Sequence, residues 1–184
     1  MTSMRFDPLR LDVAVFARNA ASLAGRWPLA AFERLVEAAH PEARPTAEDH
    51  LEWSLRGEWR RGAGLESNAW LHVSASAALR LQCQRCLAPV DTVVAVERAL
   101  CFVAGEQQAA ALDIDSEDDV LALTASLDAR ELMEDELLLA MPLVPRHERC
   151  PEPLWAEDRA ADAPEPAAPP HAFAALKQLK KGAD

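Results

Sequence analysis

The stretch LHVSASAALRLQC, residues 71–83, decides the fold of this chain. Every second residue from Leu71 to Cys83 is apolar or a cysteine, and the residues between them are mostly small or polar. This period of two is typical of a β-strand that is buried on one face and exposed on the other. The sequence therefore predicts a long half-buried strand that ends at Cys83.

The residues on either side extend this strand into a sheet. Residues 86–89, Cys-Leu-Ala-Pro, have the composition of a turn, and residues 90–103 predict a returning antiparallel strand. Leu51, Trp53 and Leu55 alternate with polar residues and predict a further strand from about residue 49. We expect an α+β fold with an antiparallel β-sheet that is built on a long central hairpin and is flanked by short helices. A barrel-like closure of the sheet stays open as an alternative.

Proline and capping signals predict where the helices begin and end. Asp7-Pro8 predicts a first helix, and Pro28 opens a second that ends before Pro41. Asp128 with Glu131 forms a capping box for a helix that ends at Pro142. Three further segments are expected to lack helix: an extended piece at 22–27, an exposed acidic loop at 106–119 and a short strand at 120–123.

Length and composition predict one folded domain with an appendage. The chain has 184 residues, of which 50% are hydrophobic and 27% charged. We expect an α+β domain at 1–150, a disordered acidic Pro-rich tether at 151–170 and a short basic amphipathic segment at 171–184. The first residues resemble no secretory signal, so a cytoplasmic location is expected, with reduced thiols and no membrane partner.

The net charge of -11 is unevenly distributed along the chain. Residues 113–136 contain ten acids and one base, whereas residues 51–100 contain six arginines and five acids. Binding of phosphate depends on the local arrangement of cations, so RNA stays a possible partner of the central arginines. A solvated sheet face is the alternative interpretation of the same arginines.

The four cysteines predict either a metal site or a turn without metal. Cys83 and Cys86 form a C-x2-C motif, and two thiolates at this spacing suit zinc, which needs about four ligands. Cys101 and Cys150 are the candidate third and fourth ligands, with His147 as an alternative to Cys150. A simple hairpin would place Cys101 far from the turn, which counts against a site of four thiols. A metal-free two-cysteine turn and a redox pair remain alternatives.

Several motifs together resemble those of the YceD family, the large ribosomal RNA subunit accumulation proteins. They are LQCQRCL at 81–87, ELMEDELLLAMPLVPRH at 131–147 and FAALK at 173–177, with Leu9-Arg10 similar to the usual opening. The chain departs from the family pattern at His171-Ala172, where Asn-Pro is usual. Some similar members also carry cysteine at the positions of Cys101 and Cys150, which favours one shared structural zinc ion.

The resemblance implies a bacterial factor without catalytic activity that supports accumulation of 23S ribosomal RNA and assembly of the large ribosomal subunit. Its partner would be 23S rRNA or a pre-50S particle. The candidate contact residues are arginines, lysines and a histidine: Arg80, Arg85, Arg98, Arg146, His147, Lys177, Lys180 and Lys181.

Two other classes of function compete with this one. A protein-binding adaptor would use the acidic helix and the basic terminal segment to recruit ribosomal proteins or an RNA-processing enzyme. A hydrolase or thiol oxidoreductase has little support, because no Ser/His/Asp set, His-rich metal motif or phosphate-binding glycine loop accompanies the C-x2-C motif. We therefore expect no catalytic residues and no small-molecule substrate.

Overall fold

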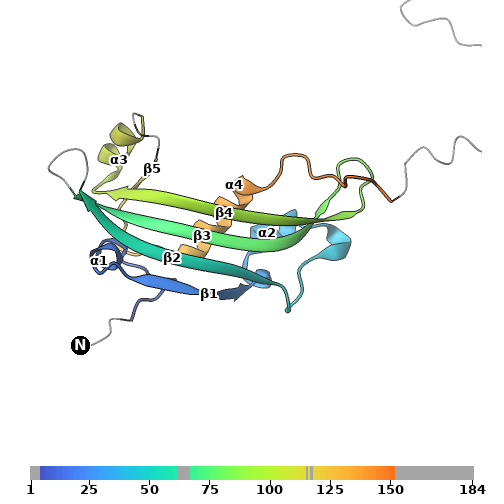
Figure 1. Ribbon diagram of the computed structural model, residues 1–184, viewed down its shortest axis with the longest axis horizontal. Coiled ribbons are helices and arrows are strands. Elements are labelled where there is room, and N and C mark those ends of the chain that lie inside the picture. Colours follow the sequence, from blue (N-terminus) through green and yellow to red (C-terminus); the bar gives the residue numbers. More distant parts are fainter. Residues whose placement is uncertain (1–4, 62–66, 115, 117, 152–184) are drawn as a thin grey trace, which may run out of the picture. The chain divides into compact units, whose positions relative to one another are not determined.

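A five-stranded sheet forms the centre of the protein, as the computed structural model in Figure 1 shows. The structure describes residues 5–61, 67–114, 116 and 118–151. The strands lie in chain order across the sheet: β1 (Ser22–Pro28), β2 (His50–Arg61), β3 (Ser67–Gln82), β4 (Pro89–Val103) and β5 (Asp119–Ala122). The first four strands run antiparallel, and β5 lies parallel to β4. The sheet is thus mixed and ends at β1 and β5, without closing into a barrel.

The predicted central hairpin is confirmed as β3 and β4. These strands pair from Ala69 opposite Phe102 to Gln82 opposite Pro89. Leu71 and its alternate neighbours along β3 are buried, as the period of two requires. We call the face that bears Leu71 the inner face of the sheet and the opposite face the outer face.

Three helices cover the inner face and a fourth packs on the outer face. Those on the inner face are α1 (Val13–Arg18), α2 (Glu33–Ala38) and α4 (Ala129–Ala140). On the outer face, α3 (Glu106–Asp113) covers a small cluster in which its Ala109 packs with Cys101 and Val120. Short 3-10 turns at Leu29–Ala31 and Pro41–Ala43 flank α2. The fold thus has one large core and one small core on opposite faces of one sheet.

The N-terminal helix begins five residues later than predicted. The Asp7 side chain accepts from the Leu9 amide at 3.0 Å, and the Asp7 carbonyl accepts from the Arg10 amide at 3.1 Å, so this segment is a turn. Asp12 caps α1 instead, accepting from the Val15 amide at 2.9 Å. Phe6 packs edge-on against Phe16, with ring centroids 5.0 Å apart. The capping signal at Asp7 was therefore a local Asx turn.

Three other predicted segments can be compared with the structure. The segment 106–119, which was predicted as an acidic loop, contains α3. Most side chains of α3 are exposed, so the sequence has no apolar periodicity there that would predict a helix. The single helix predicted after Pro28 is split, with Phe32 between a 3-10 turn and α2. The capping residue of α4 is confirmed, because the Asp128 side chain accepts from the amides of Arg130 and Glu131.

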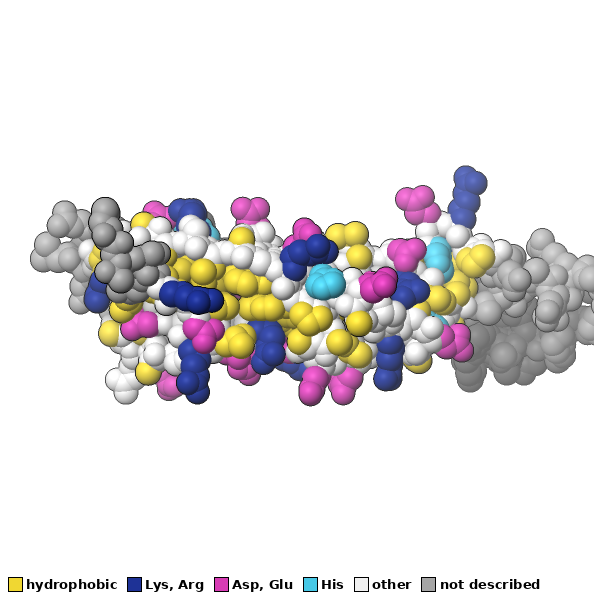
Figure 2. Space-filling view, turned by 90° about the horizontal axis from the view of Figure 1, so that it is seen from below, with side chains coloured by type: hydrophobic (Ala, Val, Ile, Leu, Met, Phe, Trp, Pro, Cys, Tyr) yellow, Lys and Arg dark blue, Asp and Glu magenta, His cyan; other side chains and the backbone are white. Residues whose placement is uncertain are grey.

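Charges of both signs are interspersed on the surface seen in Figure 2. On the outer face Arg26 lies near Glu52, and Glu58 binds Arg60 at 2.7 Å. On the inner face Arg98 lies 3.6 Å from Glu136 of α4. Paired charges of this kind leave less positive potential for a polyanion than the count of arginines implies.

The chain forms two compact units by its contacts, residues 1–149 and 150–184. Only Cys150 and Pro151 of the second unit are among the described residues, so the predicted tether and basic segment lie outside them. Within the described part of the chain, no helix is long and apolar enough to cross a membrane.

Candidate metal centre

The turn between β3 and β4 is a tight structure that places two thiols close together. The Leu87 amide donates to the Cys83 carbonyl at 2.9 Å, and the Cys83 amide donates to the Ala88 carbonyl at 3.0 Å. Leu87 has a φ of 61°, which puts it in the left-handed region that a leucine rarely adopts. Cys83 is buried and Cys86 is partly exposed. The C-x2-C motif therefore folds back on itself at the end of the hairpin.

The segment 145–148, which follows α4, is hydrogen-bonded to this turn. The Gln84 amide donates to the Pro145 carbonyl at 2.9 Å. The Arg85 guanidinium donates to the carbonyls of His147 and Glu148, at 2.9 and 3.4 Å. These contacts bring His147 to the two cysteines although it lies about sixty residues further along the chain.

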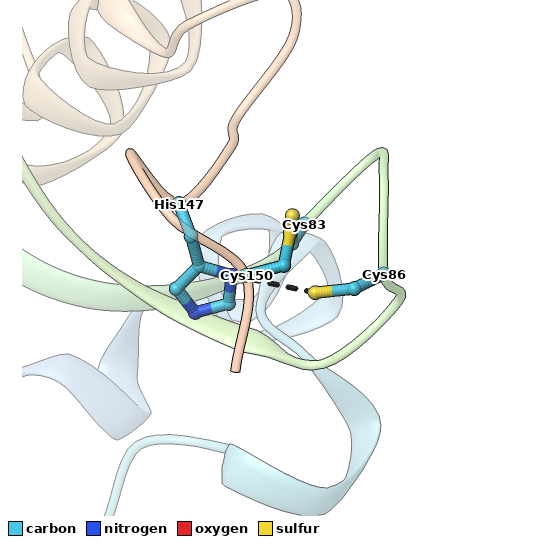
Figure 3. A group of neighbouring side chains, drawn as sticks. All are labelled: Cys83, Cys86, His147 and Cys150. Carbon is cyan, nitrogen blue, oxygen red and sulfur yellow. Dashed lines mark hydrogen bonds between the residues drawn. The ribbon is translucent and has the colours of Figure 1, made fainter. Parts of the chain in front are cut away.

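Four side chains converge at this place. The sulfur atoms of Cys83, Cys86 and Cys150 and a ring nitrogen of His147 all lie within 4.8 Å of one another. Figure 3 shows the first two on the hairpin turn and the other two on the segment after α4. Three sulfurs and one imidazole are a common ligand set of structural zinc sites. We call these four residues the Cys3His group.

The distance between two of the ligand atoms already suits a tetrahedral ion. The Cys86 Sγ lies 3.4 Å from the His147 Nδ1. In a tetrahedral zinc site with Zn–S near 2.3 Å and Zn–N near 2.0–2.1 Å, these two atoms are about 3.6 Å apart. The pair therefore needs little movement, whereas the widest separations in the group must shorten.

The orientation of the His147 ring also fits a metal ligand. Its Nε2 lies 3.0 Å from the Pro89 carbonyl oxygen. A carbonyl can only accept, so Nε2 carries the proton and the Nδ1 of the neutral ring presents its lone pair to Cys86. Histidines that bind metals typically donate their other N–H to a carbonyl or carboxylate in this way. The hairpin thus supplies the partner that fixes the tautomer of His147.

The Cys83 thiol is held in a state that favours a metal. Burial raises its pKa, but hydrogen bonds from the backbone amides of Cys86, His147 and Arg85, and from the Cys86 side chain, lower the pKa to about 5. The thiolate, which is the form that binds metals, therefore predominates at neutral pH. Amide donors around a buried sulfur stabilise the negative charge before any ion arrives.

Cys101 lies away from the Cys3His group. It pairs with Trp70 near the far end of the hairpin, and its side chain is buried beneath α3. Trp70 and Gln82 are twelve positions apart on β3, a span of about 40 Å in a strand. Burial raises the pKa of Cys101, so its thiol stays protonated. The prediction of Cys101 as a metal ligand is therefore wrong, and His147 takes its place in the group. Cys150 belongs to the group as predicted.

The comparisons with known proteins cover more than half of the chain. A family model described as large ribosomal RNA subunit accumulation protein YceD matches residues 71–180. The chain belongs to the YceD family. All four residues of the Cys3His group lie inside the matched range. No solved structure matches this chain.

The residues predicted to contact RNA in this YceD protein are scattered over the described structure. Arg80 is exposed on the outer face opposite Asp91, and Arg146 is exposed beside the Cys3His group. Arg85 braces the group, and Arg98 faces acids on the inner face. The three lysines, Lys177, Lys180 and Lys181, lie outside the described residues. No single basic surface unites those that are described, and their contact with RNA stays a prediction.

The structure adds one residue that the sequence did not indicate. His40 is only 6% exposed, and its Nδ1 accepts from the Glu42 amide at 3.2 Å. Its Nε2 must then carry the proton, and it donates to the carbonyl of Leu87 at 3.0 Å. His40 therefore supports the strained turn of this YceD chain from behind. A lone histidine before a proline carries no sequence signal for such a role.

Proposed function

We propose that this protein is a non-enzymatic factor that supports accumulation of 23S rRNA and assembly of the large ribosomal subunit. The family match over residues 71–180 carries this proposal, because the family is named for accumulation of the large ribosomal RNA. The Cys3His group is the only cluster among the described residues that could hold a metal ion. Its four ligands suit a structural ion rather than a catalytic one. Cytoplasmic residence follows from the proposed partner.

Depletion of the protein in its host tests the proposal directly. We expect the ratio of 23S to 16S rRNA to fall and free large subunits to become fewer, with both restored by the wild-type gene on a plasmid. The measurements are rRNA quantification and sucrose-gradient profiles. Unchanged 23S levels and unchanged subunit profiles after depletion would falsify the proposal.

A protein-binding adaptor is the second candidate, and one surface favours it. Leu139, Leu143 and Val144 at the end of α4 are exposed, to 78%, 98% and 52%. Exposed apolar side chains this close together often mark a protein contact. Cross-linking in cells decides between the two: peptides joined to RNA favour direct binding, and peptides of 131–147 joined only to other proteins favour the adaptor.

We further propose that the Cys3His group binds one structural zinc ion. Four ligands fill the tetrahedral shell of zinc and leave no open position for a substrate, which is the pattern of structural rather than catalytic sites. The ion would join the hairpin turn to the segment after α4. Magnesium and calcium prefer oxygen ligands, whereas this group offers three sulfurs and one nitrogen.

Metal analysis of the purified protein tests the zinc site. We expect about one zinc per chain, with marked loss in Cys86→Ser and in His147→Ala. Cys101→Ala is the matched control, because that cysteine is far from the group and should leave the zinc content unchanged. Wild-type protein purified without added metal that carries almost no zinc, and takes up none, contradicts the site and leaves the metal-free turn or the redox pair.

A further inference from the structure

A recess lies at the end of the hairpin that is opposite to the Cys3His group. It is a hollow of about 360 Å³ where the end of α1 meets β2, β3 and the beginning of α3. Trp59, Ala69 and Phe102 contribute apolar surface to it. Its size is within the range of small-molecule sites, roughly 300–1,000 Å³.

One arginine and one indole dominate this recess. The guanidinium carbon of Arg18 lies 4.5 Å from the centroid of the Trp59 ring, so the cation is held against the aromatic face. Trp59 remains 37% exposed in this arrangement. An exposed indole beside a cation offers a surface on which a flat ring can stack.

The charge of Arg18 is available to a ligand. Within the described residues no carboxylate lies within ion-pair distance of it, whereas Arg34, Arg56, Arg60 and Arg98 are all ion-paired. Arg18 is therefore a cation next to an exposed ring, and no carboxylate in the described part of the chain neutralises it. Such a cation attracts a phosphate group.

Polar side chains that can both donate and accept hydrogen bonds lie at the rim of the recess. Asn68 and Gln108 have amide side chains, and Ser67 has a hydroxyl. The Asn68 amide also hydrogen-bonds to the Cys101 thiol, which fixes its position. Asn68 lies opposite Arg60 on the outer face, whereas Trp59 lies opposite Ala69 on the inner face, so these groups serve as the polar rim of the recess.

We infer that this recess binds one unpaired nucleotide of single-stranded RNA. The base stacks on Trp59 and the phosphate binds Arg18. The inference deepens the proposed function, on which it rests for the source of the RNA, but its chemistry can be tested without a ribosome. A duplex cannot supply the ligand, because its bases are already stacked and paired.

A matched pair of residues on the outer face provides the control. Arg60 lies 4.7 Å from the centroid of the Trp70 ring, which is the same kind of stack. Glu58 neutralises Arg60 at 2.7 Å, and Trp70 packs against the cluster beneath α3. Neither Arg60 nor Trp70 lines the recess, so changes at these two residues alter an arginine–tryptophan pair outside it.

The experiment is a binding titration of the full-length protein with a fluorescently labelled oligouridine and with a duplex of equal length. We expect saturable binding of the single strand, weakened about 5- to 150-fold in Trp59→Leu, since stacking of one base contributes about 1–3 kcal/mol. Arg18→Gln should weaken binding and flatten its salt dependence. Trp70→Leu and Arg60→Gln should bind within about twofold of wild type.

Several results would overturn the inference. They are absence of single-strand binding, equal binding of duplex, or unchanged binding in both Trp59→Leu and Arg18→Gln. Arg18 is exposed on the last turn of α1, so Arg18→Gln keeps the test valid if Trp59→Leu fails to fold. Normal 23S levels in depleted cells, together with intact RNA binding in the titration, contradict the proposed function while sustaining the recess.

Discussion

At the scale of single residues, Gly57 shows how closely α1 approaches the sheet. A Cβ at this position would lie 2.7 Å from Phe16 Cδ1, 2.8 Å from the Phe16 carbonyl oxygen and 2.9 Å from Ala17 Cα. Two of these atoms belong to the backbone of a helix and cannot turn aside. A glycine in the middle of β2 therefore exists to let α1 pack directly on the strand.

We expect Gly57→Ala to destabilise the protein by about 1–3 kcal/mol through overpacking. Gly25→Ala is the matched control, because the three atoms nearest to a Cβ there all belong to the Trp53 ring, at 3.0 to 3.3 Å, and none is backbone. Both changes remove similar conformational freedom from the unfolded chain, so their difference reports the clash. The measurement is urea unfolding of each variant, and equal stability of the two would show that α1 moves aside at little cost.

At the scale of elements, the hairpin turn and the segment after α4 are joined by polar contacts and by the Cys3His group. Hydrogen bonds from the turn to this segment run from Gln84 to Pro145 and from Arg85 to His147 and Glu148. The strands behind the turn are held by a continuous ladder, whereas residues 141–149 contain no helix or strand. The group thus fixes an element that has few backbone hydrogen bonds of its own.

Removing the proposed zinc ion should loosen these elements before the sheet. We expect faster amide hydrogen exchange in residues 83–88 and 141–149 after chelation, and unchanged exchange at the centre of β3. Mass-spectrometric exchange of chelated and zinc-loaded protein measures this, with the peptide around Ala109 beneath α3 as an internal control. A uniform increase across the chain would mean instead that the metal stabilises the whole fold.

At the scale of the whole molecule, the sequence predicted the elements that have a local signal, such as alternation or a cap. It missed the elements that depend on contacts with distant parts of the chain. The alternation from Leu71 to Cys83 and the cap at Asp128 are local signals, and both correspond to observed elements. The parallel pairing of β5 with β4 and the helix at 106–113 depend on tertiary contacts that no local pattern encodes.

The candidate site shows the same division between local and distant information. The pairing of Cys83 with Cys86 is visible in four consecutive residues. The choice of His147 over Cys101 depends on two features that are not local: the register of the hairpin, which places Cys101 opposite Trp70, and the path of the chain after α4. The contact between His40 and the carbonyl of Leu87 is also not local, because the two residues are far apart in the sequence. The sequence therefore predicted three of the four residues of the group, Cys83, Cys86 and Cys150, and assigned to Cys101 the place that His147 holds.

The unbroken pairing of β3 with β4 has a mechanical consequence. Ala69, beside the Trp59 recess, and Cys83, at the Cys3His group, lie fourteen residues apart on one line of chain, a length of about 45 Å. A ladder without a bulge resists bending, so the hairpin behaves as a fixed-length strut. A partner that touches both ends must match that spacing, and a pull applied at one end displaces the other.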